Sequence, residues 1–149
     1  MNAPRADTPL DVRIYLLTLG TFALGTDVFV IAGILPMIAG DLGVSVEAAG
    51  QMVTVYALTY ALGSPILAAL AAQWHRERVV VLALAGFATA DLACSLAPSF
   101  AILLAARFLA GASGALFSPT AYTIAAALAP AERRGAALAR VALGMTSAT

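Results

Sequence analysis

Long apolar runs separated by short polar breaks make up most of the chain. Four runs cover residues 14–38, 46–72, 79–96 and 100–128, and a fifth begins near Arg133 and ends at Thr149. A bilayer-spanning helix needs about 20 mostly apolar residues, so each of the first four runs can cross a membrane. Barrel strands are about 10 residues long and alternate in polarity, which these runs do not. The pattern predicts an all-α integral membrane protein in which residues 14–149 form helices 1 to 4 and the start of helix 5.

The breaks carry residues that commonly start helices. Ser45 can cap the second span, with Glu47 in its first turn, and Ser99 can cap the fourth. Such short connections place consecutive helices antiparallel. The first run is longer than the apolar core of a cleaved signal sequence, and further spans follow it, so we expect it to be retained as a helix.

Composition supports this class and excludes another. The 149 residues are 62% hydrophobic and 11% charged, with a mean hydropathy of +0.94, far from the values of an ordinary soluble domain. The formal net charge is zero and all eight Lys/Arg positions are arginine, so no broad cationic face is available for nucleic acid. We therefore expect no nucleic-acid partner. Cys94, the single cysteine, lies in an apolar run and is interpreted as a small core residue.

The arginines indicate which side of the membrane each connection occupies. They precede the first span, lie between the second and third, and surround the fourth-to-fifth connection, whereas segments 38–45 and 97–99 contain no Lys or Arg. By the positive-inside rule, residues 1–13 form a cytoplasmic tail and every basic connection is cytoplasmic. Trp74 is suited to anchor the cytoplasmic end of the second span. The lysine-free, alanine- and arginine-rich composition is typical of a GC-rich bacterial source, which predicts the bacterial cytoplasmic (inner) membrane.

Three ionisable residues lie inside the predicted spans: Asp27, Asp91 and Arg107. A charge at the centre of a membrane helix costs roughly 2.5–3.5 kcal/mol on insertion scales, so these side chains are expected to face protein or a watery cavity and to have partners. At about 1.5 Å per residue, Arg107 lies about 10 Å below the outer surface, Asp27 about 16 Å and Asp91 about 8 Å. An arginine side chain can bridge these differences, so either carboxylate can be its partner.

Two interpretations of this group follow. In one, Asp27 or Asp91 exchanges a proton, and its proton affinity changes when Arg107 pairs with it, because burial disfavours a charged carboxylate and a guanidinium favours it. Such a group couples a proton gradient to movement. In the other, Asp91 and Arg107 form a structural salt bridge between the third and fourth spans. We favour coupling for Asp27, whose depth gives it no capping or interfacial role, and the structural bridge for Asp91, while Arg107 can serve both.

Small residues and prolines predict close packing and bending. Gly111 and Gly114 lie on a small-residue face of the fourth span, which permits near contact between backbones. Pro65 and Pro119 lie well inside the second and fourth spans, where proline frees a backbone carbonyl and favours a kink. These features occur in transporters and in static bundles alike. Five polar residues can line a polar cavity or hydrogen-bond within their own helix: Thr26, Tyr56, Tyr60, Ser118 and Tyr122.

Four segments resemble one family in their order and spacing. They are "LGTFALGTDVFVIAGILPMIAGDLGVS" (19–45), "QWHRERVVVLAL" (73–84), "LAARFLAGASGALFSPTA" (104–121) and "LAPAERRGAALA" (128–139). Together they resemble the N-terminal part of a major facilitator superfamily transporter, in the twelve-helix drug:proton antiporter branch that includes arabinose-efflux-type and chloramphenicol-resistance permeases. The resemblance implies part of the N-terminal six-helix bundle of that fold, and proton-coupled efflux by alternating access.

The resemblance also implies roles for single positions within the spans. Asp27 lies in what looks like the family's first-helix motif, which lines the central cavity near the substrate and proton path. Arg107 matches the arginine of the fourth-helix motif, which in the family is associated with proton coupling. The implied site is therefore shared between the first and fourth helices.

The loop between the second and third spans looks like a gating motif with two departures. Arg76 and Arg78 match the basic end of the family's cytoplasmic loop motif, which latches the inward face closed. Ala72 stands where the motif has an acidic residue, and His75 where it has a glycine. Arg76 and Arg78 can therefore act in a cytoplasmic gate or only as topology determinants.

The leading hypothesis is the N-terminal part of a proton-coupled exporter of a drug, sugar or metabolite, energised by the proton gradient and needing no cofactor. Its expected partners are the small-molecule substrate, membrane lipid and the remaining helices of the same transporter, because a half-built fifth span leaves backbone groups unsatisfied in lipid. One alternative is a small four-helix multidrug exporter acting as a dimer, which the fifth run and Arg107 disfavour. Another is a non-transporting membrane scaffold or truncated product. An enzyme is disfavoured, because the sequence shows no metal-ligand cluster, nucleophile–base set or phosphate loop.

Overall fold

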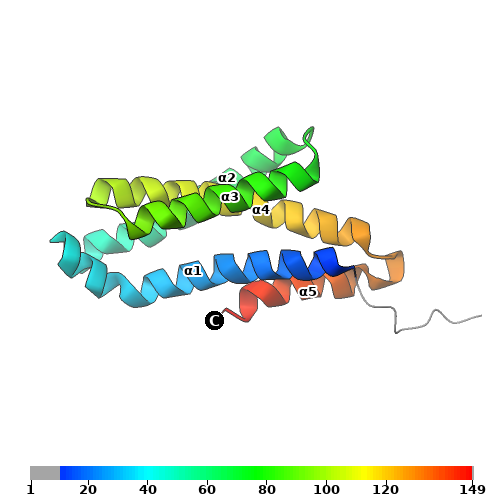
Figure 1. The fold of residues 1–149 in the computed structure, drawn as a ribbon, viewed down its shortest axis with the longest axis horizontal. Helices are drawn as coiled ribbons and strands as arrows, with labels where there is room; N and C mark the ends of the chain where they lie inside the picture. Colours follow the sequence, from blue (N-terminus) through cyan, green and yellow to red (C-terminus); the bar gives the residue numbers. More distant parts are fainter. Residues whose placement is uncertain (1–10, 149) are drawn as a thin grey trace, which may run out of the picture.

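Helices make up all of the regular secondary structure in residues 11–148, the part of the chain that the computed structural model describes (Figure 1). The elements in order are α1 (Val12–Leu42), α2 (Val46–Ala71), α3 (Arg76–Ser95), α4 (Phe100–Leu128), the 3-10 turn η1 (Ala131–Arg133) and α5 (Arg134–Thr146). Helices α1 to α4 are each long and apolar enough to cross a membrane. The predicted all-α membrane class is confirmed.

Two helices extend beyond the predicted apolar runs: α1 at both ends, and α3, which begins at Arg76 rather than at Val79. Helix α1 begins at Val12, because the Asp11 side chain accepts a hydrogen bond from the Arg13 backbone N–H at 2.9 Å. It continues past residue 38 to Leu42 and ends at Gly43, whose φ of 63° is the left-handed conformation that glycine adopts at helix ends. Hydrophobicity marks where a chain enters lipid rather than where its helix stops, so polar residues continue the helix at both ends. Of the predicted tail 1–13, residues 1–10 lie outside the described part.

Three prolines lie inside helices without ending them. Helices α1, α2 and α4 each continue through an internal proline, at Pro36, Pro65 and Pro119 respectively. Pro36, which was not among the expected kink positions, lies in the last two turns of α1. Figure 1 shows that the C-terminal part of α1 bends away from the rest of the helix. Proline removes an intrahelical hydrogen bond, which makes such a bend easier.

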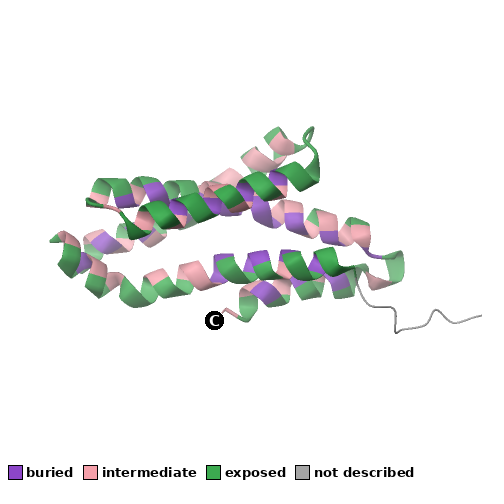
Figure 2. Ribbon diagram, in the orientation of Figure 1, coloured by how far each residue is buried: buried purple, intermediate pink, exposed green. Residues whose placement is uncertain are grey.

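Helix α4 is the centre of the bundle and packs mainly against α2 and α3. It contains the largest number of buried residues, whereas the outer faces of α1 and α3 are exposed (Figure 2). A Cβ atom added to Gly111 would lie 2.7 Å from the Tyr56 carbonyl oxygen, and one added to Gly114 would lie 3.1 Å from the Tyr56 hydroxyl. These two glycines therefore let the backbones of α2 and α4 approach closely. In lipid such close packing matters, because burial of apolar surface does not drive helices together there.

Helix α1 packs mainly against α5, and the two form a second group beside α2–α4 (Figure 1). The Thr21 hydroxyl donates to the Val141 carbonyl oxygen at 2.8 Å, and the Thr18 hydroxyl donates to the Arg140 carbonyl oxygen at 3.2 Å. A Cβ atom on Gly144 would collide with Thr21 and with the Thr18 carbonyl oxygen. The absence of a side chain at Gly144 therefore permits the contact between the two helices.

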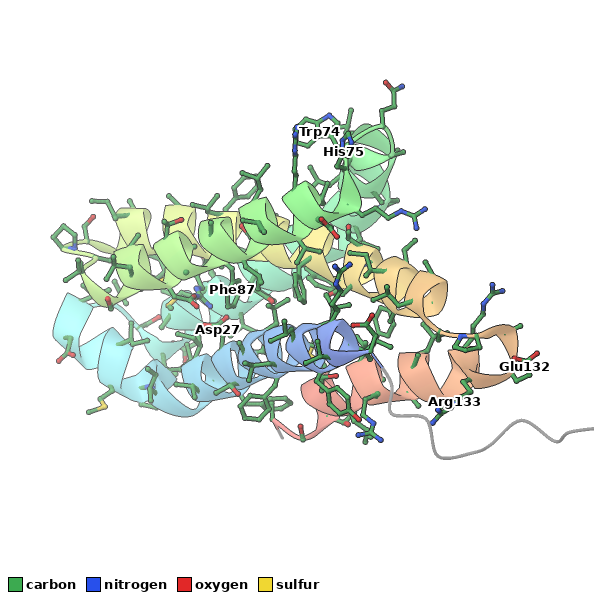
Figure 3. The ribbon with its side chains drawn as sticks, turned by 45° about the vertical axis from the view of Figure 1, so that its right-hand side comes forward. Asp27, Trp74, His75, Phe87, Glu132 and Arg133 are labelled. Atoms are coloured by element: carbon green, nitrogen blue, oxygen red, sulfur yellow. The ribbon has the colours of Figure 1, made fainter. Side chains whose placement is uncertain are left out.

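The two ends of the bundle differ in charge. The connections α1–α2 and α3–α4 lie at one end, here called the Gly43 end, and the connections α2–α3 and α4–α5 lie at the other, the Arg76 end (Figure 1). At the Gly43 end, Asp41 lies in the last turn of α1 and Glu47 in the first turn of α2. Trp74, His75, Glu132 and Arg133 lie at the Arg76 end, far from Asp27 (Figure 3).

Candidate functional site

The guanidinium of Arg107 joins two carboxylates inside the bundle. Its side chain is 2% exposed, on α4. Nη1 donates to both oxygens of Asp27, at 3.0 and 2.8 Å, and Nη2 donates to Oδ1 of Asp91 at 3.0 Å. Nε donates to the Cys94 sulfur at 3.2 Å, and the guanidinium carbon lies 5.8 Å from the centre of the Tyr56 ring. We call Asp27, Asp91 and Arg107 the ion triad.

The ion triad links α1 to the closely packed helices α3 and α4. Asp27 is on α1, Asp91 on α3 and Arg107 on α4, and α1 makes few backbone approaches to α4 compared with those it makes to α5. An arginine presents donors in a planar fork, so one guanidinium can hold two carboxylates on different edges. Either carboxylate was a possible partner from helix depth, and the structure pairs Arg107 with both.

The two carboxylates have different environments. The Asp27 side chain is 10% exposed and both of its oxygens face Nη1, whereas the Asp91 side chain is 37% exposed and only Oδ1 is bound to the guanidinium. Asp27 is therefore held firmly in the bundle interior, and Asp91 lies partly open to its surroundings. With one guanidinium and two carboxylates, the ion triad has a formal charge of −1 when all three groups are ionised.

A cavity of about 360 Å³ adjoins the ion triad and extends toward the Gly43 end. Its polar wall is formed by the ion triad, Cys94, Ser95 and, at the Gly43 end, Asp41, and its apolar wall includes Ile31, Ile34, Ile38 and Leu42 of α1. Water or a small ligand in this cavity can reach the exposed side of Asp91. The mixed lining suits a small molecule that has both apolar and polar or cationic parts.

Cys94 corrects one expectation from the sequence. It was interpreted as a core residue, but the structure places it half-buried in the cavity wall, where its sulfur accepts the Arg107 Nε–H. Cys94 follows Asp91 by three residues on α3, a spacing that puts both side chains on one helix face. This spacing in the sequence was the signal that Cys94 lies beside Asp91.

The five residues predicted to line a polar cavity do not border this one. Tyr56 is buried against Arg107, its ring is stacked on Tyr60 with centres 6.2 Å apart, and its hydroxyl has no hydrogen-bond partner among the described residues. Thr26 donates to the Phe22 carbonyl oxygen of its own helix. Ser118 is buried and Tyr122 is half-buried on α4. A substrate-lining role for these residues stays a prediction.

The arginines of the predicted gate lie apart from the ion triad. Arg76 and Arg78 are exposed at the Arg76 end, and neither forms an ion pair with a residue in the described range 11–148. Arg76 borders a second cavity of about 230 Å³ between α2, α3 and α4, together with Ala72. Their role in a gate stays a prediction. Within residues 11–148, no cluster of His, Cys, Asp and Glu has the arrangement of a metal site.

Four apolar spans and an ion triad centred on the buried Arg107 define a multi-pass helical membrane protein. Comparison with known proteins gives its family. The model of the Major Facilitator Superfamily matches residues 17–149, and the chain belongs to this family of membrane transporters, whose members are not enzymes.

Individual relatives agree with this assignment. The chain is 40% identical over 140 residues to a chloramphenicol resistance protein of Streptomyces lividans, a match covering 94% of this chain and 36% of that protein. It is 36% identical over 135 residues to the uncharacterized MFS-type transporter YbcL of Bacillus subtilis, covering 91% and 35%. It is 32% identical over 136 residues to the putative transporter AraJ of Escherichia coli, covering 91% and 34%. The chain thus spans about a third of the length of these relatives.

Proposed function

We propose that the protein is a proton-coupled secondary active exporter of a small molecule, which works by alternating access in the bacterial cytoplasmic membrane. The observation that carries this proposal is the ion triad, which places two carboxylates and one guanidinium among apolar spans at distances of 2.8–3.0 Å. Ionisable groups at such depth are costly, and in transporters they mark proton and substrate pathways. The family and the name of the Streptomyces lividans relative support export.

Proton binding changes the balance of attractions in the ion triad. When one carboxylate takes up a proton it loses its charge, and Arg107 is then held by the other carboxylate alone. Because the three groups belong to α1, α3 and α4, this alters the forces between helices. The free energy of proton binding is thereby available to favour one arrangement of the transporter over another. The proton gradient supplies the energy, and no cofactor is needed.

The proposed substrate is a drug-sized amphipathic molecule, with a sugar or metabolite as the alternative. The cavity beside the ion triad combines a carboxylate-bearing wall with an isoleucine-rich wall, which favours molecules with apolar and polar parts. In the proposed orientation the arginine-rich Arg76 end faces the cytoplasm. The Gly43 end and the mouth of the cavity then face outward.

The test is efflux by the natural protein and its Asp27→Asn variant in inside-out membrane vesicles. We expect a pH gradient to drive transport of chloramphenicol or another compound of a drug and sugar panel, and Asp27→Asn to reduce this transport at least tenfold. The amount of protein in the membrane should be unchanged, because an asparagine at 27 removes a buried charge rather than adding one. Glu47→Gln, which alters an exposed carboxylate at the Gly43 end, is the matched control.

Two results would contradict the proposal. Undiminished pH-driven transport in Asp27→Asn would remove Asp27 from the coupling site. A natural protein that moves no compound of the panel, and an Asp27→Asn variant without any phenotype, would favour the non-transporting membrane protein instead.

A further inference from the structure

The ion triad holds its two carboxylates unequally. Both oxygens of Asp27 lie within 3.0 Å of Nη1 of Arg107. Asp91 uses only Oδ1, at 3.0 Å from Nη2, and its Oδ2 accepts no hydrogen bond from a residue in the described part of the chain. A carboxylate with a free oxygen can bind a proton without first breaking a contact to the guanidinium. In this geometry that carboxylate is Asp91.

Access to the cavity also distinguishes the two residues. Asp91 is 37% exposed and Asp27 is 10% exposed, although both border the 360 Å³ cavity that extends toward the Gly43 end. A proton that enters through this cavity therefore meets the exposed side of Asp91. At Asp27 the same proton meets a carboxylate whose two oxygens both accept hydrogen bonds from Arg107.

The charged and polar groups around Asp91 favour its binding of a proton. Arg107 faces it from α4, Asp27 from α1 and Cys94 from its own helix, while the centre of the Tyr56 ring of α2 lies 5.8 Å from the guanidinium carbon. Asp41 of α1 adds another negative charge at the cavity wall nearer the Gly43 end. The groups around the cavity therefore carry more negative than positive charge, and one added proton brings the ion triad from a formal charge of −1 to neutrality.

We propose that Asp91 is the residue that receives the proton from the cavity, while Asp27 stays ionised as the fixed counter-ion of Arg107. This assignment rests on the proposed proton coupling and specifies which carboxylate of the ion triad performs it. The proton binds Oδ2 of Asp91, the carboxylate becomes a neutral carboxylic acid, and no covalent bond between heavy atoms changes. Arg107 keeps its two contacts to Asp27. Protonation therefore loosens the link from α3 to α4 and preserves the link from α1 to α4.

The experiment is infrared difference spectroscopy of the purified natural protein, which needs no substrate. Acidification should produce a carboxylic C=O band, which the Glu47→Gln control retains. Asp91→Glu, which keeps the formal charge of the ion triad at −1, should shift the frequency of this band, because the band belongs to the residue that carries the proton. Asp27→Glu, the matched change at the other carboxylate, should leave the frequency unchanged. Size-exclusion profiles matching that of the wild type show that each variant is folded.

An unshifted band in Asp91→Glu, or a shifted band in Asp27→Glu alone, would overturn the assignment. The spectroscopic result is independent of transport. If the natural protein carries no substrate but the Asp91 band is present, the proposed export function fails and the location of the proton stands. If export is present and the band belongs to Asp27, the export function stands and the Asp91 assignment fails.

Discussion

At the residue scale, Arg107 is the group on which the site depends. All three kinds of nitrogen in its guanidinium donate, to Asp27, Asp91 and Cys94. A lysine has a single ammonium group and cannot present donors to three partners in one plane. The sequence indicated Arg107 and its two carboxylates, because charges are conspicuous among apolar residues. It did not indicate that one arginine holds both carboxylates, since helix depth fixes the level of a side chain but not the direction in which it points.

Removal of the guanidinium should destabilise the bundle through the charges left behind. Arg107→Ala leaves two buried or partly buried carboxylates without a cation, a change that typically costs about 3–5 kcal/mol. Combining it with Asp27→Asn and Asp91→Asn should recover much of this loss, because no uncompensated charge then remains. The measurement is the thermal unfolding temperature of the natural protein, of Arg107→Ala and of the triple variant, each purified in detergent. A triple variant that is as unstable as Arg107→Ala would mean that packing by the arginine side chain, rather than charge, accounts for the loss.

At the element scale, the pairing of α1 with α5 was not predictable from the sequence. Its contacts are hydroxyl–carbonyl hydrogen bonds from Thr18 and Thr21, and the close approach at Gly144. Threonine hydroxyls commonly bond within their own helix, and a single glycine is no signal for a particular partner. The helices themselves were predictable, because continuous apolar runs of membrane length have few other structures available in lipid. Their ends were less predictable, since Arg13, Asp41 and Arg76 lie in polar turns that are helical.

Gly144 and Gly135 offer a matched comparison on one helix. A Cβ atom at Gly144 would collide with α1, whereas a Cβ atom at Gly135 meets no atom within 4 Å. Gly144→Ala should therefore destabilise the protein by about 1–3 kcal/mol, the usual cost of overpacking. Gly135→Ala should be neutral or slightly stabilising, because alanine is the better helix former. Thermal unfolding of the two variants decides the matter, and equal effects would argue against a close α1–α5 contact.

At the scale of the whole molecule, the charges separate the two ends of the bundle. Among the described residues, Arg13, Arg76, Arg78, Arg133 and Arg134 lie at or beside the Arg76 end. An exposed ion pair between Arg13 and Glu77 at 3.3 Å connects the starts of α1 and α3 there. An exposed pair of this kind contributes little to stability. Its place in the molecule matters more, because it shows that both helices begin at the same end, which the positive-inside rule assigns to the cytoplasm.

Cysteine labelling tests this orientation directly. In a Cys94→Ser background of the natural protein, Val46→Cys places an exposed thiol at the Gly43 end and Glu77→Cys places one at the Arg76 end. A membrane-impermeant maleimide added to intact cells should label Val46→Cys and leave Glu77→Cys unlabelled. Inside-out vesicles should give the opposite pattern, and the Cys94→Ser parent provides the background. Labelling of Glu77→Cys in intact cells would reverse the proposed topology.

The separation of Asp27 from Arg107 along the chain has a consequence for biosynthesis. The two residues are 80 positions apart, whereas Asp91 and Arg107 are 16 apart. At about 5–20 residues per second, the ribosome adds Arg107 roughly 4–16 s after Asp27. Helix α3 can thus enter the bilayer together with its counter-ion as a hairpin. The Asp27 carboxylate of α1 lacks this counter-ion until α4 is made, so in lipid it is less costly in its protonated, neutral form until then.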